Sequence, residues 1–243
     1  MSGESGGMTS RTTLAVLLLA VAAPAQAAER TFTITSFDRI RVDGPFRVTL
    51  TTGVAPFARA TGSLDAVNSV SVDVQGRTLI VRGNPSSWGG YPGQARGPVE
   101  VAVGTHELSQ AWLNGSGTLA INRIEGLQFD LAIQGSGSAA VGHAEVDQLE
   151  IGISGAGSAT IAGSAPKVTA VVRGTSSLDA SALEAKDATI GAEGPSTVRV
   201  NASNSVEVDA RGVASIEVIG EPACTVRAEG SATVSGCAAT STY

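Results

Sequence analysis

Apolar and polar residues alternate along most of the chain after residue 30, and the alternation recurs with a period of 18 to 20 residues. Each repeat aligns on one glycine. Positions two and four residues before that glycine, and four residues after it, are apolar or small, whereas the positions between them are mostly polar. A period of two indicates β-strands with one face inward, and a fixed longer period is typical of a solenoid. The aligned glycines are Gly115, Gly135, Gly155, Gly174, Gly194, Gly212 and Gly230.

Each repeat therefore holds two short strands, one before and one after the glycine, with a turn that completes the coil. Equivalent residues of successive coils lie about 4.8 Å apart when such coils stack. The pattern predicts one all-β domain over residues 28–243, a parallel β-helix (β-solenoid) with coils of about 18–20 residues. The most regular coils cover about 109–237, and the segments before them extend the stack.

The repeated glycine phrase is interpreted as a structural corner. By its parity the glycine points inward, as does the small residue two positions later, so we expect a corner without room for a large side chain. Glycine also tolerates the backbone angles that a corner requires. The alternative is a nucleotide loop, since "GSGSAA" at 135–140 matches a dinucleotide fingerprint. That fingerprint needs a helix directly after the glycines, and here a strand pattern follows, which excludes it.

The first residues read as a secretory signal peptide, residues 1–27. Arg11 precedes an apolar run that ends in a small-x-small site at Ala25 and Ala27. The run is short for a membrane span, and the mature chain contains no other candidate for a transmembrane segment. We expect an exported protein, periplasmic or extracellular.

The two cysteines are predicted to form a disulfide at the C-terminal end. Export to an oxidising compartment favours pairing of Cys224 with Cys237. Cys224 has an inward offset, and no further regular coil follows to cover it. The alternative is one buried and one exposed free thiol.

Composition excludes several functions. The chain is 42% hydrophobic but only 4% aromatic, so small and branched aliphatic residues must build the core. A net charge of −6 disfavours nucleic-acid binding. His106 and His143 occupy different offsets in their repeats, and the cysteines lack the spacing of a zinc site. We therefore expect no catalytic residue, metal or cofactor, and a protein that is not an enzyme.

Two outward-facing columns of residues have alternative interpretations. A hydroxyl lies three residues after every aligned glycine, from Thr118 to Thr233, and we interpret it as a hydrogen-bonding ladder rather than an ice- or glycan-binding face. Directly before the last four aligned glycines the charge alternates in sign, as it does at Asp179, Arg199 and Glu217. Such charges favour one register of coil on coil, and a binding face is the alternative. The alternating residues before the glycines are Arg173, Glu193, Arg211 and Glu229.

Several phrases resemble the bacterial family of putative auto-transporter adhesin head GIN domains. They are "RIRVDGPFRVTLTTG" at 39–53, "VDVQGRTLIVRG" at 72–83 and "VEVAVGTHELSQAWLNGSG" at 99–117, followed by the glycine-serine repeats. The resemblance implies a right-handed β-helix outside the cytoplasm and an adhesin-like structural or interaction module of unknown partner and oligomeric state. It implies no catalytic residue. By fold analogy alone, the alternative is a β-helix lyase or hydrolase acting on acidic polysaccharide.

One segment interrupts the strand pattern. "NPSSWGGYPGQARGP" at 84–98 contains Trp88, Tyr91 and Arg96 among glycines and prolines that preclude regular structure. Exposed loops on rigid scaffolds often carry binding residues, and these side chains suit a cell-envelope glycan or a protein partner. The segment is therefore the candidate partner-binding loop. Alternatively, its aromatic residues cover an end of the solenoid.

Overall fold

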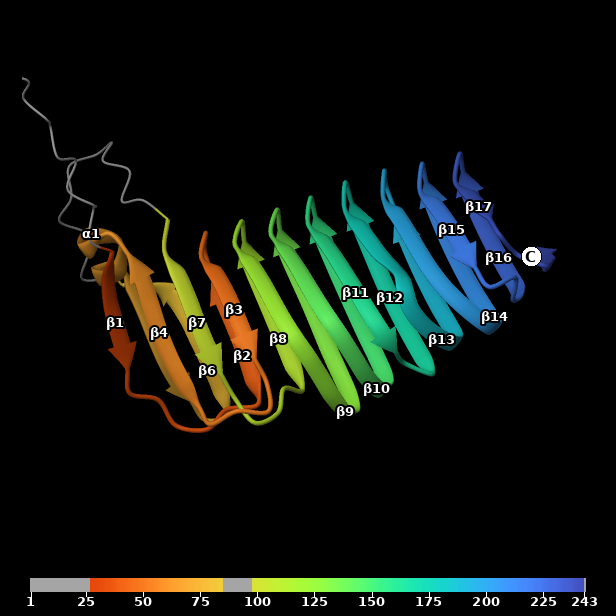
Figure 1. The fold of residues 1–243 in the computed structure, drawn as a ribbon. Coiled ribbons are helices and arrows are strands. Elements are labelled where there is room, and N and C mark those ends of the chain that lie inside the picture. The colour runs from red at the N-terminus through yellow and green to blue at the C-terminus, as the bar shows by residue number, and fades with distance from the viewer. Residues whose placement is uncertain (1–26, 85–97, 243) are drawn as a thin grey trace, which may run out of the picture.

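The protein forms a β-solenoid, which confirms the predicted fold class (Figure 1). The structure is a computed structural model and describes residues 27–84 and 98–242 of the 243. Its elements are β1 (Ala28–Phe32), β2 (Arg39–Asp43), β3 (Arg47–Thr51), β4 (Phe57–Gly62), α1 (Leu64–Asn68), β5 (Val70–Gln75), β6 (Thr78–Gly83), β7 (Glu100–Gly104), β8 (Gln110–Gly115), β9 (Thr118–Gly135), β10 (Ser138–Gly155), β11 (Ser158–Ser164), β12 (Lys167–Gly174), β13 (Ser177–Glu193), β14 (Thr197–Gly212), β15 (Ser215–Ile219), β16 (Ala223–Gly230), β17 (Thr233–Ser235) and β18 (Ala239–Thr242).

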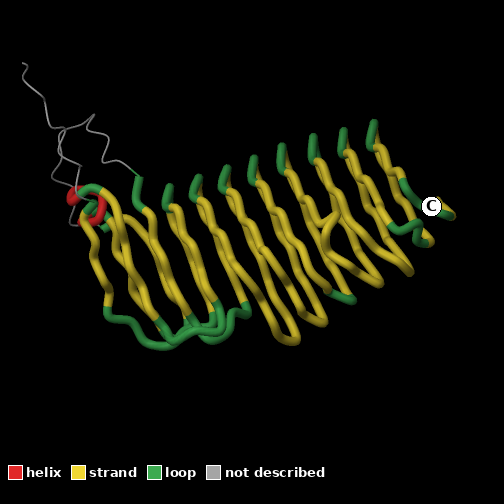
Figure 2. The backbone as a smooth tube through the Cα atoms, in the orientation of Figure 1, coloured by secondary structure: helices red, strands yellow, loops and turns green. Residues whose placement is uncertain are grey.

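Each regular coil has two walls that meet at the glycine turn (Figure 2). We call the strand segments that end at the aligned glycines the pre-turn wall, and those that begin after the turn the post-turn wall. β9 and β10 are each 18 residues long and bend, so that each contributes to both walls. Successive coils pair in parallel and residue on residue, as in Gly155 opposite Gly135. The inward columns, such as Ile133 beside Ile153, fuse into one core that runs the length of the stack.

The aligned glycines lie at the turns, but their predicted inward orientation is wrong. They are exposed or half-buried, and their φ angles run from 83° at Gly194 to 110° at Gly135, where side chains are strained. A Cβ on Gly155 would lie 2.6 Å from the carbonyl oxygen of Gly135 in the preceding coil. Crowding therefore comes from the neighbouring backbone. The position two residues later does face inward, and Gly117, Gly137 and Gly157 are buried there.

The N-terminal strands extend the stack out of chain order. β2 pairs in parallel with both β6 and β8, and β3 with both β7 and β9. The coil of residues 39–51 is thus inserted between that of 78–104 and that beginning at 110. The residues that precede β2, β6 and β8 meet at one point, because Asp38 forms an ion pair with Arg77 at 2.5 Å and its carbonyl oxygen accepts the N–H of Ser109 at 2.8 Å.

Antiparallel strands close the N-terminal end of the solenoid. β4 pairs antiparallel with β7 and β1 with β4 on one wall, and β5 pairs antiparallel with β6 on the other. Helix α1 begins after Ser63, whose side chain accepts the N–H of Ala66, and it buries Ala66 and Val67 against the core. Figure 1 shows α1 at this end of the stack. The cap thus combines reversed strand direction with apolar burial.

A disulfide between Cys224 and Cys237 closes the C-terminal end, which confirms the predicted pairing. Cys224 is buried, at 3% exposure, on the pre-turn strand β16. β18 covers only the first half of β16, from Ala223 to Val226, and β17 covers three residues of β15. The last coil is therefore covered in part by short strands and secured by a covalent link.

Candidate functional site

The predicted partner-binding loop lies outside the described residues, because Trp88, Tyr91 and Arg96 all fall within 85–97. Its attachment points are described. β6 ends at Gly83 and β7 begins at Glu100, so the segment joins the two walls of one coil at the place where the regular coils have a glycine turn.

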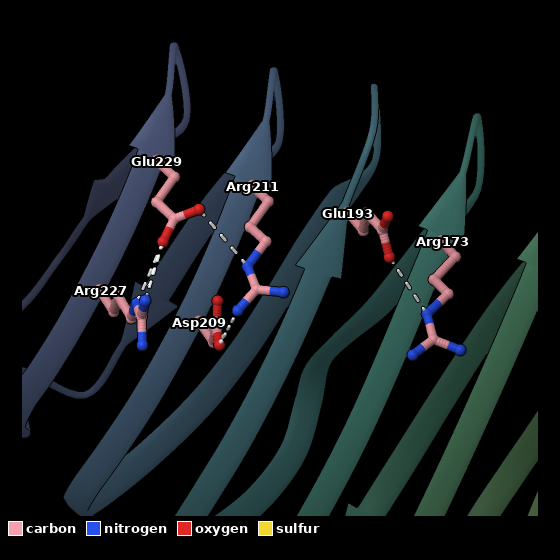
Figure 3. Close-up of polar contacts among 6 residues, drawn as sticks. All are labelled: Arg173, Glu193, Asp209, Arg211, Arg227 and Glu229. Atoms are coloured by element: carbon pink, nitrogen blue, oxygen red, sulfur yellow. Dashed lines mark hydrogen bonds and ion pairs between the residues drawn. The ribbon is translucent and has the colours of Figure 1, made fainter.

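A group of charged side chains lies on the pre-turn wall from β12 to β16 (Figure 3). Arg173 pairs with Glu193 of the next coil at 3.3 Å. Farther along, Arg211 binds Asp209 of its own strand at 3.1 Å and Glu229 of the next coil at 3.7 Å. Arg227 binds Glu229 at 3.0 Å. We call these six residues the charged patch.

The charged patch is a set of two groups rather than the continuous ladder that the sequence suggested. Glu193 and Arg211 are register partners on β13 and β14, but the contacts group Glu193 with Arg173, and Arg211 with Asp209 and Glu229. The four side chains of the ladder keep half or more of their surface exposed, between 50% and 64%. Exposed pairs of this kind stabilise by less than about 1 kcal/mol each, and the groups remain accessible to a partner.

A shallow hollow of about 150 Å³ lies within the charged patch. Its lining includes Gly191, which has no side chain, together with Val171, Arg173 and Asp209. Val171 is an exposed valine on this wall, at 37% exposure. One oxygen of Asp209 is buried without a hydrogen-bond partner in the part of the chain that the structure describes. Sequence reasoning missed this hollow, and its signal was Gly191, which stands between Val171 and Asp209 in the column three positions before the aligned glycines.

The post-turn wall carries a separate charge pair. Arg199 of β14 binds Glu217 of β15 at 2.9 Å. Asp179 instead accepts a bond from the hydroxyl of Ser181 at 2.6 Å and one from its backbone N–H at 3.1 Å. These bonds favour the ionised carboxylate, and together with the nearby positive charge of Arg199 they lower the pKa of Asp179. The hydroxyl column lies on the same wall, with Ser138 in register between Thr118 and Ser158.

At the bend opposite the glycine turns, Asp187 joins two coils. It accepts bonds from the side-chain amide of Asn204 at 2.6 Å and from the hydroxyl of Ser205 at 2.5 Å, both on the next coil. The hydrogen bond from Ser205, and to a smaller extent the one from Asn204, stabilises the ionised carboxylate and lowers the pKa of Asp187. This carboxylate therefore links neighbouring coils through hydrogen bonds.

The structure keeps the two histidines apart. His106 is exposed in the connection between β7 and β8, and His143 is exposed on β10. Over residues 27–84 and 98–242, histidine, cysteine, aspartate and glutamate form no cluster of three or more that is arranged to hold a metal ion. Within the same ranges no helix has the length and apolar character needed to cross a membrane.

Comparison with known proteins identifies one family model and several bacterial structures with a similar fold. The family model described as "Putative auto-transporter adhesin, head GIN domain" matches residues 36–222. A "putative adhesin" from Bacteroides fragilis has a similar structure, with a TM-score of 0.68, 17% identity, and coverage of 89% of this chain and 96% of the other. A "putative lipid binding protein" from Parabacteroides distasonis has a TM-score of 0.68 at 17% identity, covering 87% and 96%. For a "putative adhesin" from Parabacteroides merdae the TM-score is 0.61 at 17% identity, covering 87% and 96%. No curated protein shows significant sequence similarity.

Proposed function

Because the chain belongs to the family described as "Putative auto-transporter adhesin, head GIN domain", we propose that it is an exported, adhesin-like module that attaches to a component of the cell envelope. The observation that carries the proposal is the outward surface of the solenoid. Its charges of both signs lie half exposed on a regular wall around a shallow hollow. Such a surface suits recognition of a complementary partner.

The place of action is proposed to be the periplasm or the cell exterior. The Cys224–Cys237 disulfide is the structural support for export, because disulfides persist in oxidising compartments. The predicted signal peptide, which falls almost wholly outside the described residues, would direct the chain there. The partner is proposed to be a cell-envelope glycan or a protein, and the loop at 84–98 with Trp88, Tyr91 and Arg96 to be its main contact.

The experiment measures attachment of the purified mature protein to isolated cell envelopes and to a panel of envelope polysaccharides. We expect the wild type to be retained, and a Trp88→Ala/Tyr91→Ala variant to lose most of its retention while its melting temperature is unchanged. An Arg199→Ala variant on the post-turn wall serves as the control with wild-type retention. Equal retention of the loop variant and the wild type would move the contact away from the loop.

The same panel tests the enzyme alternative. Polysaccharide chemistry needs carboxylates or basic residues that converge on one groove, whereas the charged patch mixes arginines and acids along an exposed wall. We expect no new reducing or unsaturated sugar ends after prolonged incubation. Their appearance would replace the adhesin proposal with a lyase or hydrolase.

A further inference from the structure

The order of charges on the pre-turn wall is complementary to its own reverse. Along the stack the column directly before the glycines reads positive, negative, positive, negative, on four neighbouring strands in strict register. Read backwards, the same column is negative, positive, negative, positive. A copy of the wall turned end over end therefore presents the opposite charge at every position. The four residues are Arg173, Glu193, Arg211 and Glu229.

We propose that this wall binds a second copy of the chain face to face, about a two-fold axis that runs parallel to the strands between β13 and β14. In that arrangement each column faces its own reversed copy. Arg173 faces the partner's Glu229, and Glu193 faces the partner's Arg211. Two-fold symmetry makes each of these pairs occur twice, as isologous interfaces require.

The neighbouring columns agree with the same axis. Three residues before the glycines, Gly191 faces the partner's Asp209, so that this side chain lies opposite the hollow of about 150 Å³ that Gly191 and Asp209 help to line. The Asp209 side chain is 47% exposed, and its Oδ2 lies 3.1 Å from Arg211 of the same strand. Five residues before the glycines, Thr189 faces the partner's Glu207, a hydroxyl opposite an acceptor. In these columns too, no two like charges face each other.

The charge balance of the wall favours a second copy over a charged polymer. Three arginines, Arg173, Arg211 and Arg227, stand among four acids, Glu193, Glu207, Asp209 and Glu229. A uniformly charged polymer would meet repulsion at about every second position along the stack. A partner with the reversed alternating pattern would not, and this chain carries that pattern itself.

The size of the surface sets the strength of binding. Four strands at about 4.8 Å and six residues at about 3.3 Å cover roughly 19 by 20 Å, or about 400 Å² on each copy. Interfaces of that size are weak or transient. We therefore expect reversible dimers that become populated at protein concentrations of about 0.1–1 mM and that dissociate as salt screens the charges.

The experiment uses two single charge reversals, Glu193→Arg and Arg211→Glu, in the mature protein, with association measured by sedimentation equilibrium at low salt. Each variant alone places like charges opposite each other twice per dimer, so we expect its self-association to be roughly tenfold weaker or less. In an equimolar mixture the introduced arginine faces the introduced glutamate, and the native Arg211 of one variant faces the native Glu193 of the other. We expect the mixture to recover wild-type association.

Recovery on mixing distinguishes binding between chains from a role within one chain, because intrachain register cannot be restored by a second variant. Glu217→Arg is the matched control, since it removes an ion pair of similar exposure from the post-turn wall and should leave association unchanged. A wild type that stays monomeric at about 1 mM, single reversals that associate like the wild type, or a mixture that does not recover would each overturn the proposal.

If a reversal variant loses the cooperative melting of the wild type, Glu193→Gln and Arg211→Gln replace the pair. Both should then weaken association and flatten its salt dependence, and unchanged association would overturn the proposal. The inference uses the same charged patch as the proposed function, whose main contact is proposed to be the loop at 84–98, and the two have separate readouts. Loss of envelope attachment with intact self-association contradicts only the adhesin proposal, and the reverse result contradicts only the dimer.

Discussion

The two ends of the solenoid are closed in different ways. At the N-terminal end, β4 and β5 run antiparallel to the coils, β1 adds a further strand, and α1 covers the core with Ala66 and Val67. At the C-terminal end the coils simply shorten, and the Cys224–Cys237 disulfide secures a partial covering by β18.

The two ends differ in how their open strand edges are protected. Strand edges left open invite pairing with other chains. The N-terminal edge strand β1 carries Glu29, paired with Arg59 at 3.0 Å, and Arg30, which stacks on Phe32 at 4.8 Å. At the C-terminal end, β18 pairs with only Ala223–Val226 of β16, and the Cys224–Cys237 disulfide links the two segments covalently. A noncovalent cap requires many long-range contacts, whereas a disulfide requires two residues.

The largest loss of stability is expected for a substitution in the central coils, which connect the two ends of the stack. Gly155→Val introduces a β-branched side chain at a φ of 109°, with its Cβ 2.6 Å from the carbonyl oxygen of Gly135. Strain and overpacking together should cost about 3 kcal/mol or more in the free energy of unfolding. Denaturant unfolding should show this loss, and the transition should split if the two ends then unfold separately.

Gly152→Val is the matched control for that substitution. It lies on the same strand, and a Cβ there would contact nothing within 4 Å. Its melting curve should stay close to that of the wild type. Equal losses at both glycines would show that the turn geometry is not the cause.

Loss of the disulfide should affect the C-terminal end alone. Cys224→Ser/Cys237→Ser opens a link with a sequence separation of 13 residues, which stabilises by about 3 kcal/mol in the chain-entropy model. Because β18 pairs only with β16, we expect faster amide hydrogen exchange in β16 and β18 and unchanged exchange in β4 and β7. Uniformly faster exchange along the chain would mean that the two ends unfold as one unit.

A smaller loss is expected from the polar contact that joins the N-terminal coils. Asp38→Ala removes a carboxylate that is 7% exposed and bonded to Arg77, and bonds to charged groups contribute about 1.5–3 kcal/mol. Amide hydrogen exchange should become faster first in β2 and β6, whereas in the disulfide variant it becomes faster at the C-terminal end. Asp147→Ala, at an exposed position of β10, should change stability by less than about 0.5 kcal/mol.

The smallest effect concerns pH. Hydrogen bonds from Ser205 and Asn204 lower the pKa of Asp187 in the folded protein. Because the pKa of Asp187 is lower in the folded protein than in the unfolded chain, its hydrogen bonds contribute their full stability above the unfolded pKa of about 4. This stability is lost as the pH falls through the pKa of the folded protein. The melting temperature of the wild type should therefore fall below about pH 4, and Asp187→Asn should make this fall shallower. Parallel curves for the two proteins would contradict a role for this carboxylate.

The sequence by itself determined the features that depend on neighbouring positions. The alternation of apolar residues and the repeat from Gly115 to Gly230 predicted parallel coils, because burial of one strand face requires a period of two and stacking requires a constant coil length. The link between Cys224 and Cys237 also followed, since these are the two cysteines of the sequence and Cys224 has an inward offset. The charges of Arg173 and Glu193 were expected to pair for the same reason.

Only the tertiary structure decided the features that depend on distant segments. No local pattern states that β2 lies between β6 and β8, because that order depends on long-range hydrogen bonds and on the contact of Asp38 with Arg77. The alternation of inward and outward positions predicted the wrong orientation for the aligned glycines, because the chain turns there and the period of two ends. The hollow at Gly191 forms where three neighbouring coils stack, because the glycine on β13 lies in register between Val171 on β12 and Asp209 on β14.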